Sequence, residues 1–277
     1  MDAITFMLPP FAACLTLIGI HGYFGIHVLK REIIFIDIAM AQIAAFGVTL
    51  AMIFHIESET LSAYLLPLIF VTLAAFVFSS LKYANLRIPL EAIIGISYAV
   101  ATTAAVIALD LSAGAHEHTK EMLIGSILWV RWSQILKSVI IYSIIGAIHF
   151  IFRHKFIPLS EDYQQARQAG MKVHWWDFLF YLTLGITVLC SVQIGGILVV
   201  FAFLVMPASI SALFARKWLP RILIGWGLGT VVSFLGLYLS WTYDAPSGPA
   251  VIIFLAVFLI LALLVSAFMK KRKLARA

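Results

Sequence analysis

A carboxylate lies inside an apolar stretch of this chain. The run KREIIFIDIAMAQIAAFG, residues 30–47, opens on two basic residues, turns apolar as a membrane helix does, and includes Asp37 and Gln42. An ionised carboxylate near the middle of a bilayer costs ~2.5–3.5 kcal/mol on insertion scales, so Asp37 is expected to face the protein interior, a partner or water. Two roles stay open: Asp37 lines a permeation path, or it is a buried carboxylate hydrogen-bonded to another span. Gln42 lies about 140° further around a helix, where an interhelical hydrogen bond is the favoured interpretation.

A second group of polar residues could bind a cation. His116, Glu117 and His118 follow one another in a segment between apolar runs, and two imidazoles with a carboxylate are ligands that suit zinc. The group either collects a metal ion before entry or belongs to a solvated loop. Glu91 and Asp177 have a simpler interpretation, because each stands at the start of an apolar run, where a carboxylate complements the positive end of a helix.

The composition indicates a membrane protein. Of the 277 residues, 63% are hydrophobic and only 12% are charged, whereas a soluble domain averages about 25% charged residues. The expected fold class is an all-α polytopic membrane protein forming a single permease domain over residues 1–277. About nine transmembrane helices are expected, near 4–29, 33–55, 61–82, 91–111, 133–153, 176–193, 196–215, 220–241 and 249–269. The sixth and seventh share one uncharged run, which must break at SVQIGG, residues 191–196, because the run is nearly twice the length of a span.

The basic residues set the orientation. All but three of the 19 lysines and arginines fall in alternate loops and in the C-terminal tail, and such loops stay in the cytoplasm. This arrangement predicts the N-terminus outside and the C-terminus inside. The apolar part of segment 119–130 is too short to cross, so it is expected to be an interfacial or re-entrant helix on the outer side.

One inside loop, residues 154–175, is long and polar and carries its own helix signals. Ser160 suits an N-cap, Asp162 suits the first turn, and Gly170 suits the position just past the helix end. The short helix either closes a loop or docks a cytoplasmic partner.

The sequence around this loop resembles a known family. An inside loop of type D-x-x-x-A-x-x-x-G followed by a G-x-L-L-V-x-A-L-L-V-x-P-A-x-x-A segment is typical of the permeases of ATP-binding-cassette importers for zinc, manganese and related metals, the type II importers. The matching residues here are Asp162, Ala166, Gly170, Gly196, Leu198, Pro207, Ala208 and Ala212. The resemblance implies that Asp162, Ala166 and Gly170 form a coupling helix that fits a groove on an ATPase subunit.

The resemblance also implies the partners and the cargo. The chain has no G-x-x-x-x-G-K-[ST] phosphate loop, so ATP hydrolysis is expected in a separate cytoplasmic ATPase subunit, and the chain is expected not to be an enzyme. An extracytoplasmic metal-binding protein, a homodimer in the cell (inner) membrane and a divalent transition metal as cargo are implied, with no nucleic acid and no cofactor of the chain's own.

One motif departs from the family pattern. The corresponding span of the family carries G-D-x-x-x-H, whose Asp and His contact the metal. Here Gln42 stands where the His is expected and Asp37 comes one residue early, and an amide is a weaker ligand than imidazole for most transition metals. The alternative function is a self-sufficient secondary cation transporter that uses Asp37 as its ion or proton site.

Overall fold

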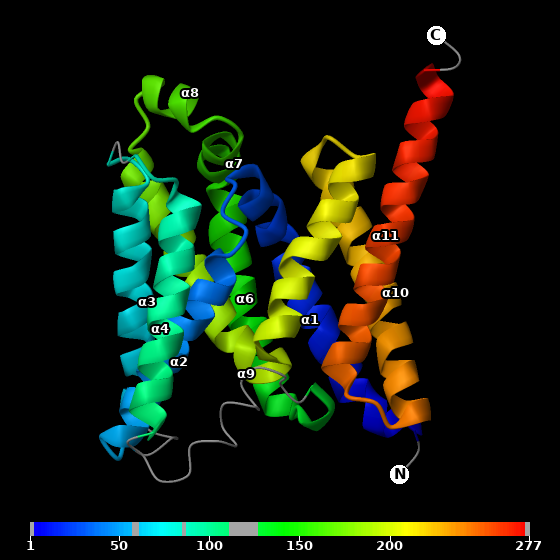
Figure 1. Cartoon of the computed structure of the whole chain (residues 1–277), viewed down its shortest axis with the longest axis horizontal. Coiled ribbons are helices and arrows are strands. Elements are labelled where there is room, and N and C mark those ends of the chain that lie inside the picture. Colours follow the sequence, from blue (N-terminus) through cyan, green and yellow to red (C-terminus); the bar gives the residue numbers. More distant parts are fainter. Residues whose placement is uncertain (1–2, 57–60, 85–86, 111–126, 275–277) are drawn as a thin grey trace. The chain divides into compact units, whose positions relative to one another are not determined.

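The chain folds into helices in this computed structural model, which describes residues 3–56, 61–84, 87–110 and 127–274 (Figure 1). The elements in these ranges are α1 (Ala3–Lys30), α2 (Ile36–Ile53), α3 (Leu61–Leu81), α4 (Leu90–Asp110), the 3₁₀ turn η1 (Ile127–Trp129), α6 (Trp132–Ile151), α7 (Arg153–Glu161), α8 (Tyr163–Gln168), α9 (Val173–Phe214), α10 (Trp218–Tyr243) and α11 (Ser247–Leu274). Within the described ranges, 8 helices are long and apolar enough to cross a membrane. The predicted all-α, multi-pass membrane class is therefore confirmed.

Helix α9 is two helices joined end to end. Its 42 residues would extend ~63 Å at 1.5 Å per residue, about twice the hydrocarbon thickness of a bilayer. The backbone leaves helical geometry at Gly196, where φ is 74° and ψ is 165°, a conformation that is essentially restricted to glycine. The break falls at the end of the predicted segment 191–196. With the two arms of α9 counted separately, the described residues hold nine spanning segments, as predicted.

The chain divides into two compact units, and α6 and α9 contribute one part to each. One unit combines residues 1–29, 124–139 and 194–277, and the other combines residues 30–123 and 140–193. In the second unit, α2 packs against both α3 and α4 (Figure 1). Gly47 permits the close approach of α2 to α3, because a Cβ at this position would lie 2.6 Å from Cα of Pro67.

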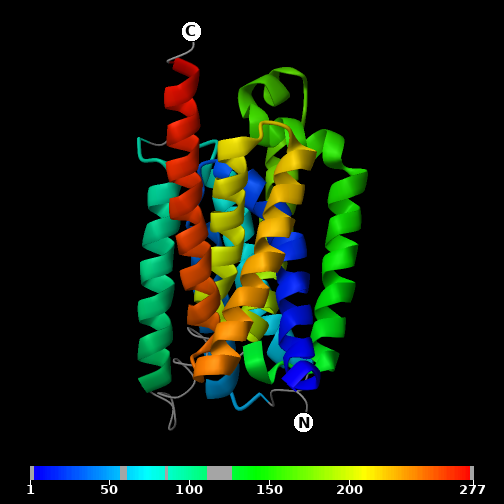
Figure 2. The same cartoon turned by 90° about the vertical axis from the view of Figure 1, so that its right-hand side faces the viewer.

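The first unit is held together by small residues at helix crossings. A Cβ on Gly25 of α1 would collide with the backbone oxygen of Leu204 in α9, and one on Gly236 of α10 would lie 2.7 Å from Cα of Val251 in α11. Figure 2 shows α10 and α11 side by side, joined by a short turn. Such close contacts are what helix association in a bilayer requires, since lipid gives no hydrophobic drive for it.

Candidate functional site

Asp177, the fifth residue of α9, lies at the centre of a buried cluster of charges. One carboxylate oxygen accepts a hydrogen bond from Nη1 of Arg31. The other accepts from Nζ of Lys82 at 2.8 Å and from the hydroxyl of Tyr83. The side chain of Asp177 is fully buried and that of Arg31 is 1% exposed. The prediction that Asp177 merely complements its own helix terminus is therefore wrong, because its partners come from two other loops.

This cluster joins three of the segments that were predicted to face the cytoplasm, the three that belong to the second unit. Arg31 belongs to the turn after α1, Lys82 and Tyr83 follow α3, and Asp177 follows the loop that carries α7 and α8. Their contacts place these loops at the same end of the second unit, as the distribution of basic residues predicts.

Two groups of the cluster lie outside the membrane-spanning helices and have shifted pKa values. Burial lowers the pKa of the Lys82 ammonium, and the adjacent carboxylate of Asp177 opposes that shift. Burial raises the pKa of the Tyr83 hydroxyl, and the negative charge of Asp177 raises it further. Tyr83 therefore keeps its proton and acts as a donor to Asp177.

The same arginine also fixes α7. Nε of Arg31 donates to Oγ of Ser160 at 2.7 Å, and its guanidinium lies 3.7 Å from the centre of the Phe180 ring, a cation–π contact. A more exposed pair between Lys30 and Glu161, 3.4 Å apart, adds a second link. Helix α7 is thus tied to the turn between α1 and α2.

Helix α8 begins two residues later than the sequence indicated. Ser160 lies inside α7 and donates to the carbonyl of Phe156 at 3.0 Å, so it does not cap α8. The N-cap is Asp162, whose side chain accepts from the backbone nitrogen of Gln165 at 3.0 Å. Gly170 follows the C-cap with φ of 78°, which is the left-handed conformation predicted for that position.

The second residue of the predicted coupling set, Ala166, faces inward. Ala166 is 5% exposed and packs in a small core with Leu159 and Val173, against which Met171 and Trp176 also pack. Asp162 caps the start of α8, Gly170 follows its end, and Ala166 packs α8 against the core, so the role of these three residues in coupling stays a prediction. The exposed residues of α8 include Tyr163, Gln164, Arg167 and Gln168, which line a shallow cavity. Their i, i+1, i+4, i+5 spacing opposite the D-x-x-x-A motif is the signal that would have identified them.

Asp37 is nearer to its helix end than the sequence suggested. Residues 31–35 form turns, with Glu32 at φ of 55°, and α2 starts at Ile36. The span predicted near 33–55 therefore starts three residues later, at Ile36, and Asp37 belongs to its first turn. Asp37 is nonetheless 1% exposed.

The bonds of Asp37 are few. Its Oδ1 accepts from the backbone nitrogen of Ile38 at 2.8 Å, while Oδ2 has no hydrogen-bond partner among the described residues. Gln42, on the same helix, is 7% exposed. Glu91, in the first turn of α4, accepts from the backbone nitrogen of Phe35 at 3.0 Å, so its carboxylate complements the N-terminus of α2 as well as its own helix.

The remaining predicted ligands do not form a metal centre in the described part of the chain. Among those residues no group of three His, Cys, Asp or Glu side chains is close enough to bind one ion. The predicted ligands His116, Glu117 and His118 lie outside the described residues, as does most of segment 119–130. Asp37 and Gln42 therefore stay predictions as cargo ligands.

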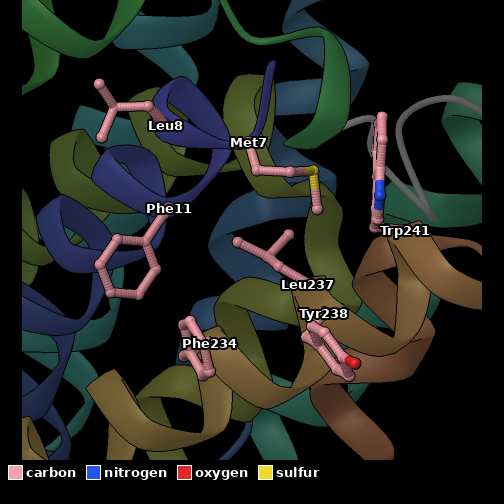
Figure 3. Close-up of a pocket in the computed structure, with 7 residues that line it drawn as sticks. All are labelled: Met7, Leu8, Phe11, Phe234, Leu237, Tyr238 and Trp241. Carbon is pink, nitrogen blue, oxygen red and sulfur yellow. The ribbon is translucent and has the colours of Figure 1, made fainter. Parts of the chain in front are cut away.

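The first unit has an apolar groove between α1 and α10 (Figure 3). It has a volume of about 410 Å³, and its lining consists of Met7, Leu8, Phe11, Phe234, Leu237, Tyr238 and Trp241. These side chains suit hydrocarbon and include no carboxylate or imidazole, so the groove is not a place where a metal ion would bind.

Comparison with known proteins agrees with this architecture. A "Manganese transport system membrane protein MntC" from Listeria innocua is 26% identical over 178 residues, which cover 64% of this chain and 63% of that protein. A "Probable iron transport system membrane protein" from Haemophilus influenzae is 28% identical over 148 residues, 53% of this chain and 54% of the relative. The chain thus aligns with less than two thirds of the length of these two relatives.

The fold itself has a solved counterpart. The structure of PsaBC from Streptococcus pneumoniae in complex with Fab matches with a TM-score of 0.78 and 20% identity, over 94% of this chain and 93% of the other. The model of the ABC 3 transport family matches residues 3–266. Because that match covers nearly the whole sequence, the chain belongs to the ABC 3 transport family.

Proposed function

We propose that the chain is the membrane permease subunit of an ATP-driven importer for a divalent transition metal, and that it works as a homodimer in the cell (inner) membrane. A separate cytoplasmic ATPase would bind the outward face of α8, and an extracytoplasmic metal-binding protein would deliver the cargo. The observation that carries the proposal is the seating of α8. Its inward residue Ala166 is buried, and the adjoining helix α7 is tied by Ser160 to the buried pair of Arg31 and Asp177.

This seating supports a role in coupling. A helix that passes the motion of an ATPase to the membrane spans must make fixed contacts with them. Helix α7, which precedes α8, contacts Arg31 through Ser160, and Arg31 belongs to the turn that leads directly into α2. Asp37 is in the first turn of α2, only six residues beyond Arg31. A displacement of α8 by an ATPase would therefore reach the proposed cargo residue through the Ser160–Arg31 hydrogen bond and the six residues of backbone that follow Arg31.

The choice of metal follows from ligand chemistry. Carboxylate and amide oxygens suit Mn²⁺ better than they suit Zn²⁺, which binds imidazole and thiolate well. Gln42 stands where the family pattern has His, so an amide oxygen would replace an imidazole nitrogen as ligand. This change favours manganese over iron(II) and zinc, the other two candidate metals. The relatives named for manganese and iron transport support the same class of cargo.

The test is uptake in proteoliposomes that contain the chain and its cognate ATPase, with and without ATP. We expect Mn²⁺ uptake to require both. Substitution Gln164→Trp, on the exposed face of α8, should abolish co-elution with the ATPase and reduce ATP-driven uptake at least tenfold, because the bulky ring blocks docking. The thermal stability of the purified chain should stay unchanged.

Substitution Lys217→Trp provides the matched control, because Lys217 is also exposed but precedes α10. It should leave uptake and co-elution at the wild-type level. Metal transport by the lone chain under an ion gradient, with no ATPase present, would overturn the proposal and support the secondary transporter instead.

A further inference from the structure

The second unit, which holds the Asp177 cluster, has another cavity beside that cluster. It has a volume of about 380 Å³. Its lining comes from the loop between α3 and α4 and from α8: Leu81, Lys82, Tyr83, Ile88, Pro89, Leu90, Tyr163 and Arg167. The lining therefore combines two cations and two phenol rings with an aliphatic wall.

The charges around this cavity are unbalanced. Lys82 and Arg31 together bring two positive charges to the single carboxylate of Asp177. Arg167 adds a third positive charge on the α8 side, and the described lining includes no carboxylate. The acidic residues of the neighbouring elements are otherwise engaged, since Glu161 pairs with Lys30, Asp162 caps α8 and Glu91 accepts from the backbone nitrogen of Phe35. A partly enclosed site with excess positive charge favours an anion.

The walls of the cavity are ordered by aromatic contacts. The rings of Tyr83 and Tyr163 meet edge to face, with centroids 5.8 Å apart. Nζ of Lys82 lies 5.6 Å from the centre of the Tyr83 ring and 5.8 Å from that of Tyr163. Lys82 is thereby held between its carboxylate partner and the cavity, so the site is already formed before any ligand arrives.

The position of the cavity indicates where the anion comes from. Leu81 is the last residue of α3 and Leu90 the first of α4, so the cavity lies where two membrane-spanning helices reach the cytoplasmic interface. Ile88, on its aliphatic wall, is 51% exposed. Phospholipid headgroups occupy this level, and the cytoplasmic leaflet is the one rich in anionic lipid. An aliphatic wall beside a cationic floor matches a headgroup with its acyl chains attached.

We propose that this cavity binds the phosphate of an anionic phospholipid of the cytoplasmic leaflet. Arg167 contacts the phosphate with its guanidinium, whose paired N–H groups fit phosphate oxygens, and Lys82 adds its charge from the floor. The acyl chains pass over Ile88 toward the faces of α3 and α4. A bound lipid would thereby join α8 to the α3–α4 loop. Tyr163 and Arg167 also belong to the face of α8 proposed for the ATPase, so lipid binding is tested on the chain alone, without cargo or ATPase.

Native mass spectrometry of the purified, delipidated full chain tests this directly. Phosphatidylglycerol should bind in preference to phosphatidylcholine of the same chain length. Substitution Arg167→Gln should weaken phosphatidylglycerol binding about fivefold, the effect of one basic residue near an anionic surface. Substitution Ile88→Glu, which places a negative charge on the cavity wall, should weaken it at least as much.

Lys172→Gln is the matched control, because Lys172 is an exposed cation of the same cytoplasmic loop that does not line the cavity. It should bind phosphatidylglycerol as the wild type does. Equal binding of the two lipids by the wild type, or an equal loss in Lys172→Gln and Arg167→Gln, would overturn the proposal. Complete displacement of the lipid by millimolar inorganic phosphate would overturn the lipid assignment and identify a site for free phosphate.

Discussion

Arg31 and Asp177 form a buried ion pair although 146 residues separate them in the sequence. The pair joins the turn after α1 to the N-terminal part of α9, and Lys82 from a third loop adds a second cation. The three loops of this unit that were predicted to be cytoplasmic thus all meet at the carboxylate of Asp177. Charges in such surroundings are stabilised only while all partners are present, because each one alone would carry the full cost of its lost hydration.

Substitution Asp177→Ala should therefore be strongly destabilising. It leaves Arg31 and Lys82 buried next to each other without a counter-charge, and breaking a buried pair in this way costs ~3–5 kcal/mol. The melting temperature of the detergent-solubilised chain should fall by about 6 °C or more. Glu161→Ala, which removes only the exposed partner of Lys30, should change it by no more than about 3 °C. Equal shifts for the two variants would show that Asp177 is not the centre of the cluster.

The sequence could not have predicted this cluster. Charge and hydropathy patterns report how each segment meets the membrane, and on that basis Asp177 looks like a residue at a helix start. Its true partners are set by tertiary packing between distant loops, and no spacing in the sequence marks them. The nine spans and the break before Gly196 were predictable, because span length and charge asymmetry are constraints that act on each segment separately.

The ends of α7 and α8 show the same contrast between features that one segment determines by itself and features that tertiary contacts determine. Gly170 was placed correctly, since a left-handed residue past a helix end is a local requirement that glycine meets at no steric cost. Ser160 was misassigned as the N-cap, because its hydroxyl is used by the carbonyl of Phe156 and by Arg31. The start of α2 was misplaced for a related reason. No glycine or proline marks the turn at 31–35, and the left-handed Glu32 there has no signal in the sequence.

The left-handed end of α8 gives a second prediction. At Gly170, with φ of 78°, a side chain other than that of Asn or Asp costs ~1–2 kcal/mol. Gly170→Ala should loosen α8 and speed tryptic cleavage after Arg167 and Lys172 about five- to tenfold, measured on the intact chain by mass spectrometry. Gly170→Asn tolerates the conformation and should be cleaved at nearly the wild-type rate. Similar rates for Gly170→Ala and the wild type would contradict the need for a left-handed residue.

Two glycines of α1 provide a third prediction with its own control. A Cβ on Gly25 would collide with the backbone oxygen of Leu204, whereas one on Gly19 would meet no other atom within 4 Å. Backbone atoms cannot move aside as a side chain can, so Gly25→Ala should lower the melting temperature by several degrees. Gly19→Ala should leave it unchanged or raise it slightly, because alanine is the better helix former by ~0.8–1.0 kcal/mol. Equal effects at the two positions would argue against close packing of α1 on α9.

The last prediction concerns Asp37, whose buried carboxylate makes a single hydrogen bond within the described part of the chain. One of its carboxylate oxygens bonds the next backbone nitrogen and the other has no partner among those residues, so its removal should cost the fold little. Asp37→Ala should insert, keep its melting temperature within about 2 °C and still bind the ATPase, but ATP-driven Mn²⁺ uptake should fall at least tenfold. Thr49→Ala removes a buried hydroxyl of the same helix that bonds the carbonyl of Ala45, and it should transport normally. Normal uptake by correctly inserted Asp37→Ala would remove Asp37 from the transport path and leave it a role only at the start of α2.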